Sequence, residues 1–375
     1  MENRGPVSRR KWITAAAVVP FSAVRGTTAN SALKIGLIGA GGRGRLDAGI
    51  LVKDRRARLV AICDLFEDRM ERARKELQVE DAKLYKNYHE MLASDVDAVL
   101  IATNEFMHPE HLEAAVKAKK HVYIEKPAGV DVEGCRRVMR AGDAAGPRLN
   151  ITFGFQQRYG PGYRKAKKLL DSGGIGPLRM AHAHWIKGAI TGNETVLPRP
   201  TNMLDKVRQH LWRETVGDII VDTYCHGVDV LNWFFGEHPS KAIGGGGRTI
   251  IKVGDIRDHL DVIFDYSRDL QATLAGSQIA PTFYRSVNEQ FFGATGVIET
   301  AREYWTHYRG RNDTVTEKEP RDITIDAIEE FLTRVIEGKP ENTAISAAET
   351  TLTSLMGRMA LDLRREVTWE EVMRS

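Results

Sequence analysis

LKIGLIGAGGRG, residues 33–44, joins a short apolar run to a glycine-rich turn, and a helical pattern follows from Leu46 to Val52. This order of strand, turn and helix is the context in which the spacing Gly-x-Gly-x-x-Gly binds a dinucleotide. Gly39 permits the turn, Gly41 lets a pyrophosphate approach the backbone, and Gly44 lets the helix pack closely on the strand. The free N–H groups at the start of the helix can bind the phosphates. The residues expected to contact the cofactor here are Gly39, Gly41, Gly42, Arg43 and Gly44.

A second apolar run, Arg58 to Cys63, predicts the next strand, and Asp64 ends it. A carboxylate at this place accepts hydrogen bonds from the adenosine ribose and repels a 2′-phosphate, which favours NAD over NADP. Asp64 could also cap the helix predicted over Glu67–Glu76. The two roles are compatible.

The alternation of strands and helices continues to residue 153 and predicts a doubly wound parallel sheet. Further strands are expected at 98–102, 121–124 and 149–153, with helices at 109–118 and 132–144. Ligands of such sheets lie at the carboxyl ends of the strands. Two loops emerge there, Thr103-Asn104-Glu105-Phe106 and Glu125-Lys126-Pro127. We therefore add Thr103, Glu125 and Lys126 to the candidate cofactor-binding residues.

Lys126 follows its strand directly, so we expect it to point into the cofactor crevice. A lysine there can donate to a sugar hydroxyl and stabilise developing alkoxide charge. The plainer alternative is a solvated lysine at the tip of a loop.

Asp222 and His226 are four residues apart, so on a helix they share a face, and Asp229 continues that stripe. An imidazole is suited to take a proton from a hydroxyl near neutral pH. Asp222 could orient a shared hydroxyl or support the imidazolium, and we interpret Asp229 as structural or as a residue that supports the site from behind. The alternative for the pair is an ordinary surface ion pair on a helix.

Four motifs in this order resemble the glucose–fructose oxidoreductase, inositol dehydrogenase and rhizopine-catabolism (Gfo/Idh/MocA) oxidoreductases. They are GAGGRG at 39–44, EKP at 125–127, GFQQRY at 154–159 and GDIIVDTYCHGVDVLNWFFG at 217–236, and the resemblance extends over roughly residues 33–375. It implies a Rossmann domain followed by an α+β domain with a large, mostly antiparallel sheet. It also implies an active site of Lys126, Asp222 and His226.

The resemblance implies NAD-dependent hydride transfer from a secondary hydroxyl of a sugar, glycoside or cyclitol. His226 would take the proton and Lys126 would stabilise the alkoxide. The further substrate-binding candidates are Arg158, His184, Trp212 and Arg213, with Trp185 as part of an aromatic platform for a sugar ring. By analogy with the family, the chain is expected to form a dimer or tetramer.

Two other functions compete with the dehydrogenase. One is a redox-neutral glycoside hydrolase that oxidises, eliminates and reduces with the same NAD; its relatives carry Tyr-Pro-Thr-His-Gly, whereas Asp222 here keeps the dehydrogenase-like acid. The other is a non-enzymatic binding protein, which Lys126 and His226 disfavour. No metal is expected, because His182 and His184 lack a third ligand nearby and the three cysteines are widely separated.

The second half of the chain predicts strands at 178–186, 259–267, 270–278 and 287–293 and helices at about 325–337 and 346–365. Residues 188–212 look like a long insert that could form a lid over the site or an arm between subunits. Gly244–Gly247 is expected to be a loop with close backbone approach or mobility. We divide the chain into a signal segment (1–30), an NAD-binding Rossmann domain (33–154) and an α+β substrate-binding and oligomerisation domain (155–375).

The signal segment carries the whole net charge of +4, since it holds five basic residues and one acid. Ser8-Arg9-Arg10-Lys11 precedes a mildly apolar run from Ile13 to Val24, a pattern typical of twin-arginine export to the periplasm. A frayed basic tail on a cytoplasmic protein is the alternative. The remaining chain is neutral, which argues against nucleic-acid binding, and no apolar stretch is long enough to span a membrane.

Overall fold

The computed structural model describes residues 32–188 and 198–375, so the predicted signal segment lies outside the described residues. Its first sheet has six parallel strands in the order β3-β2-β1-β4-β5-β6. Their bounds are β1 Leu33–Ile38, β2 Ala57–Cys63, β3 Lys83–Tyr85, β4 Ala98–Ile101, β5 His121–Ile124 and β6 Ile151–Phe153. The doubly wound parallel sheet is confirmed. The sequence missed β3, because its three residues are partly exposed at the sheet edge and carry no apolar pattern.

Helices cover both faces of this sheet: α1 Gly42–Leu51, α2 Glu67–Glu76, α3 Tyr88–Leu92, α4 His108–Lys117 and α5 Val132–Ala145. Short 3-10 turns lie between them: η2 Glu105–Met107, η3 Gly146–Arg148 and η4 Gln156–Tyr159. The buried runs β4 and β5, both apolar at nearly every position, pair in the centre of the sheet and fix its carboxyl edge.

The second sheet has nine strands in the order β14-β13-β12-β11-β7-β10-β9-β8-β15. Only the β7–β10 pair is parallel, so the predicted large, mostly antiparallel sheet is confirmed. The strands are β7 Leu178–Gly188, β8 Lys241–Gly247, β9 His259–Asp265, β10 Gln271–Ala280, β11 Ser286–Gly293, β12 Val297–Ala301, β13 Tyr304–Gly310, β14 Asp313–Lys318 and β15 Val367–Thr368.

The four glycines at 244–247 do not form the predicted loop, because they are the second half of β8. A Cβ on Gly244 would lie 2.4 Å from the Asp261 carbonyl oxygen of β9, and one on Gly246 would lie 2.6 Å from that of His259. The close backbone approach is therefore real, and it occurs within a strand pair.

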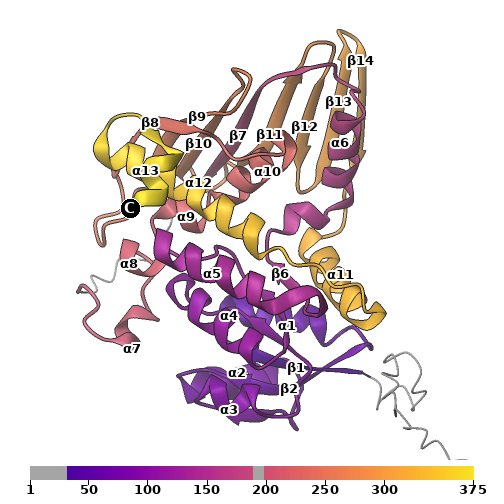
Figure 1. The fold of residues 1–375 in the computed structure, drawn as a ribbon, viewed down its shortest axis with the longest axis vertical. Helices are drawn as coiled ribbons and strands as arrows, with labels where there is room; N and C mark the ends of the chain where they lie inside the picture. The colour runs from indigo at the N-terminus through magenta and orange to yellow at the C-terminus, as the bar shows by residue number, and fades with distance from the viewer. Residues whose placement is uncertain (1–31, 189–197) are drawn as a thin grey trace, which may run out of the picture.

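Helices of the second half join the two sheets: α6 Pro161–Asp171, α7 Met203–Lys206, α8 Arg213–Val216, α9 Ile219–Asp222, α10 Cys225–Phe235, α11 Ile323–Glu337, α12 Ala344–Leu363 and α13 Trp369–Arg374. In Figure 1, α12 (yellow) runs between the two sheets, and it packs against α5 as well as β8. α11 packs on the first sheet, where Phe331 meets Tyr123 edge-on. The division of the chain into two domains at residue 154 stays a prediction. α11 and α12 lie beyond this residue in sequence, yet they pack against elements of the N-terminal half.

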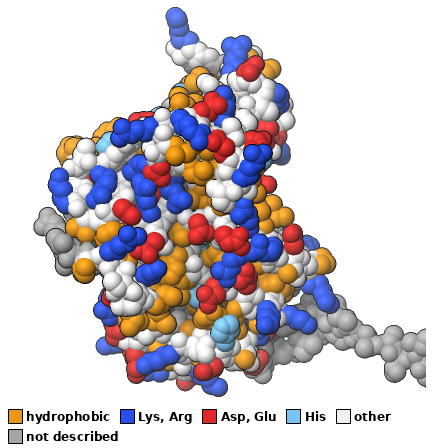
Figure 2. Space-filling view, turned by 60° about the vertical axis from the view of Figure 1, so that its left-hand side comes forward, with side chains coloured by type: hydrophobic (Ala, Val, Ile, Leu, Met, Phe, Trp, Pro, Cys, Tyr) orange, Lys and Arg blue, Asp and Glu red, His pale blue; other side chains and the backbone are white. Residues whose placement is uncertain are grey.

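On the face drawn in Figure 2, basic and acidic side chains are interspersed among apolar ones. Among the described helices, none is both long and apolar enough to cross a membrane.

Candidate active site

A single cavity of about 850 Å³ extends along the carboxyl edge of the first sheet. Its lining begins at the glycine turn and reaches the loops after β4 and β5 and the helices α9 and α10. All three predicted catalytic residues and all but one of the predicted cofactor residues line it: Gly39, Gly41, Gly42, Arg43, Asp64, Thr103, Glu125, Lys126, Asp222 and His226. The exception is Gly44, which packs against the Gly39 carbonyl. Residues far apart in sequence therefore face one space large enough for a dinucleotide and a small substrate.

The glycine turn has the shape that a dinucleotide needs. Gly39 adopts φ of +93°, and a Cβ on Gly44 would lie 1.9 Å from the Gly39 carbonyl oxygen. A Cβ on Gly41 would instead meet nothing within 4 Å, so this side of the turn is open to the cavity. Together with the N-terminus of α1, this open turn fits the pyrophosphate of a dinucleotide.

The Asp64 carboxylate lies at the carboxyl end of β2 and holds the turn in place. One oxygen accepts from the N–H of Ala40 at 2.8 Å and the other from the N–H of Phe66 at 3.0 Å. Phe66, and not Asp64, occupies the N-cap position of α2, so the alternative that Asp64 is the N-cap of this helix is wrong. Asp64 remains within the cavity lining, where the ribose of a dinucleotide would reach it.

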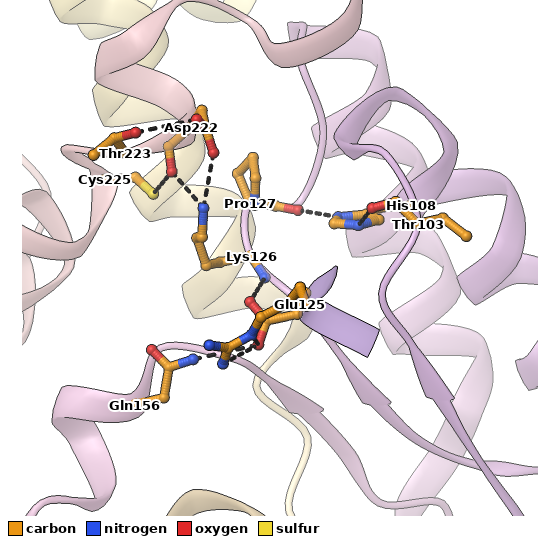
Figure 3. Close-up of polar contacts among 10 residues, drawn as sticks. Thr103, His108, Glu125, Lys126, Pro127, Gln156, Asp222, Thr223 and Cys225 are labelled. Atoms are coloured by element: carbon orange, nitrogen blue, oxygen red, sulfur yellow. Dashed lines mark hydrogen bonds and ion pairs between the residues drawn. The ribbon is translucent and has the colours of Figure 1, made fainter. Parts of the chain in front are cut away.

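Lys126 reaches from the loop after β5 to the end of α9. Its Nζ donates to the Asp222 backbone carbonyl at 2.6 Å and to Oδ1 of the Asp222 side chain at 2.9 Å (Figure 3). Burial alone would lower the pKa of Lys126, but the negative charges around it, that of Asp222 foremost, together outweigh burial and raise that pKa above its ordinary value. Lys126 is therefore a charged ammonium group at the cavity wall rather than a solvated loop residue.

Asp222 and His226 do not lie on one continuous helix, which corrects the sequence interpretation. Asp222 ends α9, and His226 lies in the first turn of α10. The Tyr224 N–H bonds to the Ile219 carbonyl, five residues back, so the helical ladder slips at this point. The slip leaves the Asp222 carbonyl to accept Lys126, and no surface ion pair forms between Asp222 and His226.

The His226 ring is held between aromatic side chains. Trp185 stacks on it at a centroid distance of 5.2 Å and an interplanar angle of 9°, and Phe155 meets it edge-on at 6.0 Å. Burial, followed by the positive charges of Arg302 and Lys126, holds the pKa of His226 well below its usual range. The imidazole is therefore neutral and able to accept a proton.

The Glu125 carboxylate organises the floor of the site. Arg43 donates to its Oε1 at 2.7 Å. The Gln156 amide lies 3.3 Å from the same oxygen (Figure 3). Arg43 also pairs with buried Asp47 at 3.0 Å. A Cβ on Gly154 would lie 2.6 Å from Glu125 Oε1, so glycine is needed there. These contacts anchor Glu125 and thereby the following residue, Lys126.

Thr103 joins this arrangement through two histidines of α4. His108 lies 3.0 Å from the Thr103 carbonyl and 2.7 Å from that of Pro127, which ties the loops after β4 and β5 together. The Thr103 hydroxyl lies 2.9 Å from the His111 ring. Thr103 is thus placed at the cavity by packing that the sequence pattern did not reveal.

The four substrate-binding candidates from the second half do not line this cavity. Arg158 turns away from it and forms a two-pronged ion pair with Asp229, which is buried and also accepts from Thr350. This explains Asp229 as a structural residue, as predicted, and makes Arg158 its counterion.

His184 faces away from His226, because alternate residues of a strand point to opposite faces. Trp185, next to it on β7, takes the inner face and stacks on His226, while His184 stacks on His182 and lies 3.3 Å from Asn288 on the outer face. Of the proposed aromatic platform, only Trp185 is at the site, and it supports His226.

Trp212 and Arg213 are engaged in packing. Trp212 donates to Gln209 at 2.6 Å, and Arg213 forms ion pairs with Asp218 at 3.2 Å and Asp362 at 2.9 Å. Both residues are therefore held by contacts with the protein itself and not by the cavity.

Among the cavity-lining residues that the sequence analysis did not propose for the site are Glu105, His210 and Arg302. Glu105 belongs to the loop expected at the carboxyl edge of the sheet, but nothing in the local sequence indicates a role for its carboxyl group. Arg302 comes from the β12–β13 turn, and its guanidinium lies 5.8 Å from the Trp185 ring. Only the pairing of distant strands brings it to His226, so no local signal could have found it.

Within the described ranges 32–188 and 198–375, no group of three or more His, Cys, Asp or Glu side chains could hold a metal ion.

Comparison with known proteins connects this geometry to a family. Residues 33–153 match the model of an oxidoreductase family with an NAD-binding Rossmann fold, and residues 163–299 match the Gfo/Idh/MocA C-terminal domain. A myo-inositol 2-dehydrogenase of Thermotoga maritima is 27% identical over 91% of this chain and 100% of its own length.

An inositol 2-dehydrogenase of Serratia proteamaculans is 35% identical over 208 residues, which is 55% of each chain, so the match spans about half the length of that relative. The fold also matches scyllo-inositol dehydrogenase from Lactobacillus casei, solved with NAD(H) and scyllo-inositol, at a TM-score of 0.75 and 21% identity over 90% of this chain and 99% of that one. Two matching domain models in the expected order confirm the predicted family. The chain belongs to the Gfo/Idh/MocA family of oxidoreductases.

Proposed function

We propose that the protein is an NAD-dependent dehydrogenase acting on a secondary hydroxyl of a cyclitol or sugar. One observation carries this: Lys126, Asp222 and His226 face the same cavity as the glycine turn. The printed activities of the relatives, inositol dehydrogenases, support the polyol class. NAD, when bound, supplies the hydride acceptor, and the protein supplies geometry and charge.

His226 acts as the general base in this proposal. Its neutral imidazole takes the proton of the hydroxyl, and Trp185 holds the ring in one orientation by stacking. Lys126 donates to the same oxygen and stabilises the negative charge that develops there. Asp222 holds Lys126 by two hydrogen bonds, so the ammonium group is oriented before substrate arrives.

The experiment is a panel of cyclitols, monosaccharides and glycosides tested with NAD for NADH formation and, separately, for release of an aglycone. NADH formation from a polyol supports the dehydrogenase. Aglycone release without net NADH would favour the redox-neutral glycoside hydrolase, which the acid at Asp222 disfavours. Absence of both products across the panel would contradict the proposal.

We further propose that the enzyme retains its NAD tightly, as an exported dehydrogenase must where free NAD is scarce. Of the predicted insert, residues 198–212 are described, and Val207 and His210 join the cavity lining; residues 189–197 are outside the described ranges. The guanidinium of Arg208 lies 4.4 Å from the Phe66 ring, and that of Arg69 lies 4.5 Å from the same ring. These cation–π contacts attach the insert to Phe66, two residues after the cavity-lining Asp64.

Retention is tested by purifying the mature protein without added nucleotide, denaturing it and quantifying the released NAD. We expect near-stoichiometric NAD and slow exchange, with faster exchange in Arg208→Ala and no change in Arg199→Ala, which stacks on Trp212 instead. Rapid exchange in the native protein would contradict retention and weaken the export proposal. Export itself is tested by replacing Arg9 and Arg10 with lysine and following periplasmic appearance.

We also propose that the outer face of the nine-stranded sheet joins subunits into a dimer or tetramer. Met180, Ile243 and Ile263 are partly exposed apolar side chains on β7, β8 and β9, and Ile243 pairs directly with Ile263. Light scattering should report an oligomer, and Ile263→Lys should shift it toward monomer. A monomeric native protein at micromolar concentration would contradict this assignment.

A further inference from the structure

Glu105 is an acidic residue at the proposed site that has no role in the hydride transfer proposed above. It starts η2 at the carboxyl end of β4 and lines the cavity together with Lys126 and Asp222. Its Oε2 atom is buried and has no hydrogen-bond donor among the described residues. Its carboxyl is within hydrogen-bonding reach of the Asp222 side chain.

The cations around Glu105 are already engaged by other carboxylates. Lys126 pairs with Asp222 at 2.9 Å, and Arg43 pairs with Glu125 at 2.7 Å and with Asp47 at 3.0 Å. Within the described part of the chain, no ion pair includes Glu105. A buried carboxylate oxygen that no donor meets and no cation pairs with is costly, whereas a protonated carboxyl beside Asp222 has an acceptor for its own hydrogen.

The titratable groups around Glu105 leave its proton in place at neutral pH. Burial, followed by the negative charge of Asp222, raises the pKa of Glu105 to about 8, although Lys126 opposes the shift. α4 and α8 pack against η2, and their titratable or charged groups are His108, Glu110, His111, Glu113, Lys117, Arg213 and Glu214. His210 and His226 also line the cavity. Arg213 and Glu214 are paired elsewhere, with Asp362 and with Lys206, respectively.

We propose that Glu105 is a positioning residue that carries a proton in the working enzyme and donates it in a hydrogen bond to Asp222. This inference rests on the proposed dehydrogenase function. The bond fixes the Asp222 carboxylate, which in turn orients the Lys126 ammonium toward the substrate oxygen. Loss of the proton places a second negative charge beside Asp222, and the Lys126–Asp222 pair then loses its fixed geometry.

The test compares Glu105→Gln with Glu105→Ala in the full-length protein, with kcat measured from pH 6.5 to 9.5. In the native protein, kcat should decline above pH 8 as Glu105 loses its proton. Glutamine keeps a donor and cannot ionise, so in Glu105→Gln the kcat at pH 7 should stay within about threefold of the native value and this alkaline decline should disappear. Alanine removes the donor, and kcat at pH 7 should fall about tenfold with NAD binding unchanged. Glu67→Gln, an exposed glutamate on α2, is the matched control and should keep the native profile.

A second measurement is independent of turnover. Difference infrared spectra of the native protein minus Glu105→Gln should show the carbonyl stretch of a protonated carboxylic acid at pH 7, and the band should vanish by pH 9.5. Absence of that band at pH 7 would overturn the proposal whether or not a substrate has been found. An alkaline decline that persists in Glu105→Gln, or equal impairment of the two variants, would also overturn it. Absence of turnover in the native protein would count against the proposed function alone.

Discussion

The two ends of the cavity are built in different ways. At the glycine end, one continuous stretch from β1 to α1 presents backbone N–H groups, and Asp64 fastens it by hydrogen bonds to two further backbone N–H groups. At the other end, the side chains come from the loops after β4 and β5, from α9 and α10, and from β7 and the β12–β13 turn. The glycine end is expected to bind the cofactor through the geometry of one short stretch of chain. The other end, called the chemical end because it holds Lys126, Asp222 and His226, forms only when both sheets are in place.

This difference predicts that chemistry and cofactor binding can be separated, most strongly at His226. His226→Ala removes the proposed base, so kcat should fall about 10²–10⁴-fold. The glycine turn is untouched, and NADH binding followed by fluorescence titration should remain near native. His182→Ala, on the outer face of β7, is the control and should leave kcat unchanged. A variant that keeps native turnover would remove His226 from the mechanism.

Lys126 should have the next largest effect. Lys126→Ala removes the positive charge at the substrate oxygen and should lower kcat about 10²–10³-fold, as loss of one oxyanion-stabilising donor does. Steady-state kinetics with a saturating polyol measures this, and Lys165→Ala, whose partner Glu317 lies on β14, serves as the control. Near-native kcat in Lys126→Ala would show that Asp222 and His226 act without it.

Arg158 tests the boundary between site and scaffold. Arg158→Ala leaves the buried Asp229 carboxylate without its counterion, so the free energy of unfolding should fall by about 3 kcal/mol. The change should appear in thermal unfolding, while the KM of the folded fraction stays near native because Arg158 does not line the cavity. A large rise in KM with unchanged stability would return Arg158 to the substrate site.

The smallest expected effect concerns cofactor choice at the glycine end. Native protein should bind NAD more tightly than NADP, and Asp64→Ala should narrow the ratio of the two dissociation constants about tenfold, because the repelling carboxylate is gone. Calorimetric titration of nucleotide-free protein measures both constants. Equal or tighter NADP binding to the native protein would contradict the assignment of Asp64 to the ribose.

Features that depend only on residues close together in the chain could be predicted from the sequence. Apolar runs bounded by glycine and acid predicted five of the six parallel strands, and the spacing Gly-x-Gly-x-x-Gly located the turn whose backbone is open at Gly41. EKP placed Lys126 at the cavity, because a residue just after a central parallel strand must emerge at the carboxyl edge.

The tertiary structure decided which side chains complete the chemical end. The slip between α9 and α10 gives Lys126 a backbone carbonyl, the pleat of β7 turns Trp185 inward and His184 outward, and a buried ion pair withdraws Arg158. None of these has a local signature, since each depends on what another element offers: a cation in reach, a ring to stack on, or a counterion. Periodicity fixes which face a residue takes within its own element, but only the packing of the two sheets fixes what that face meets.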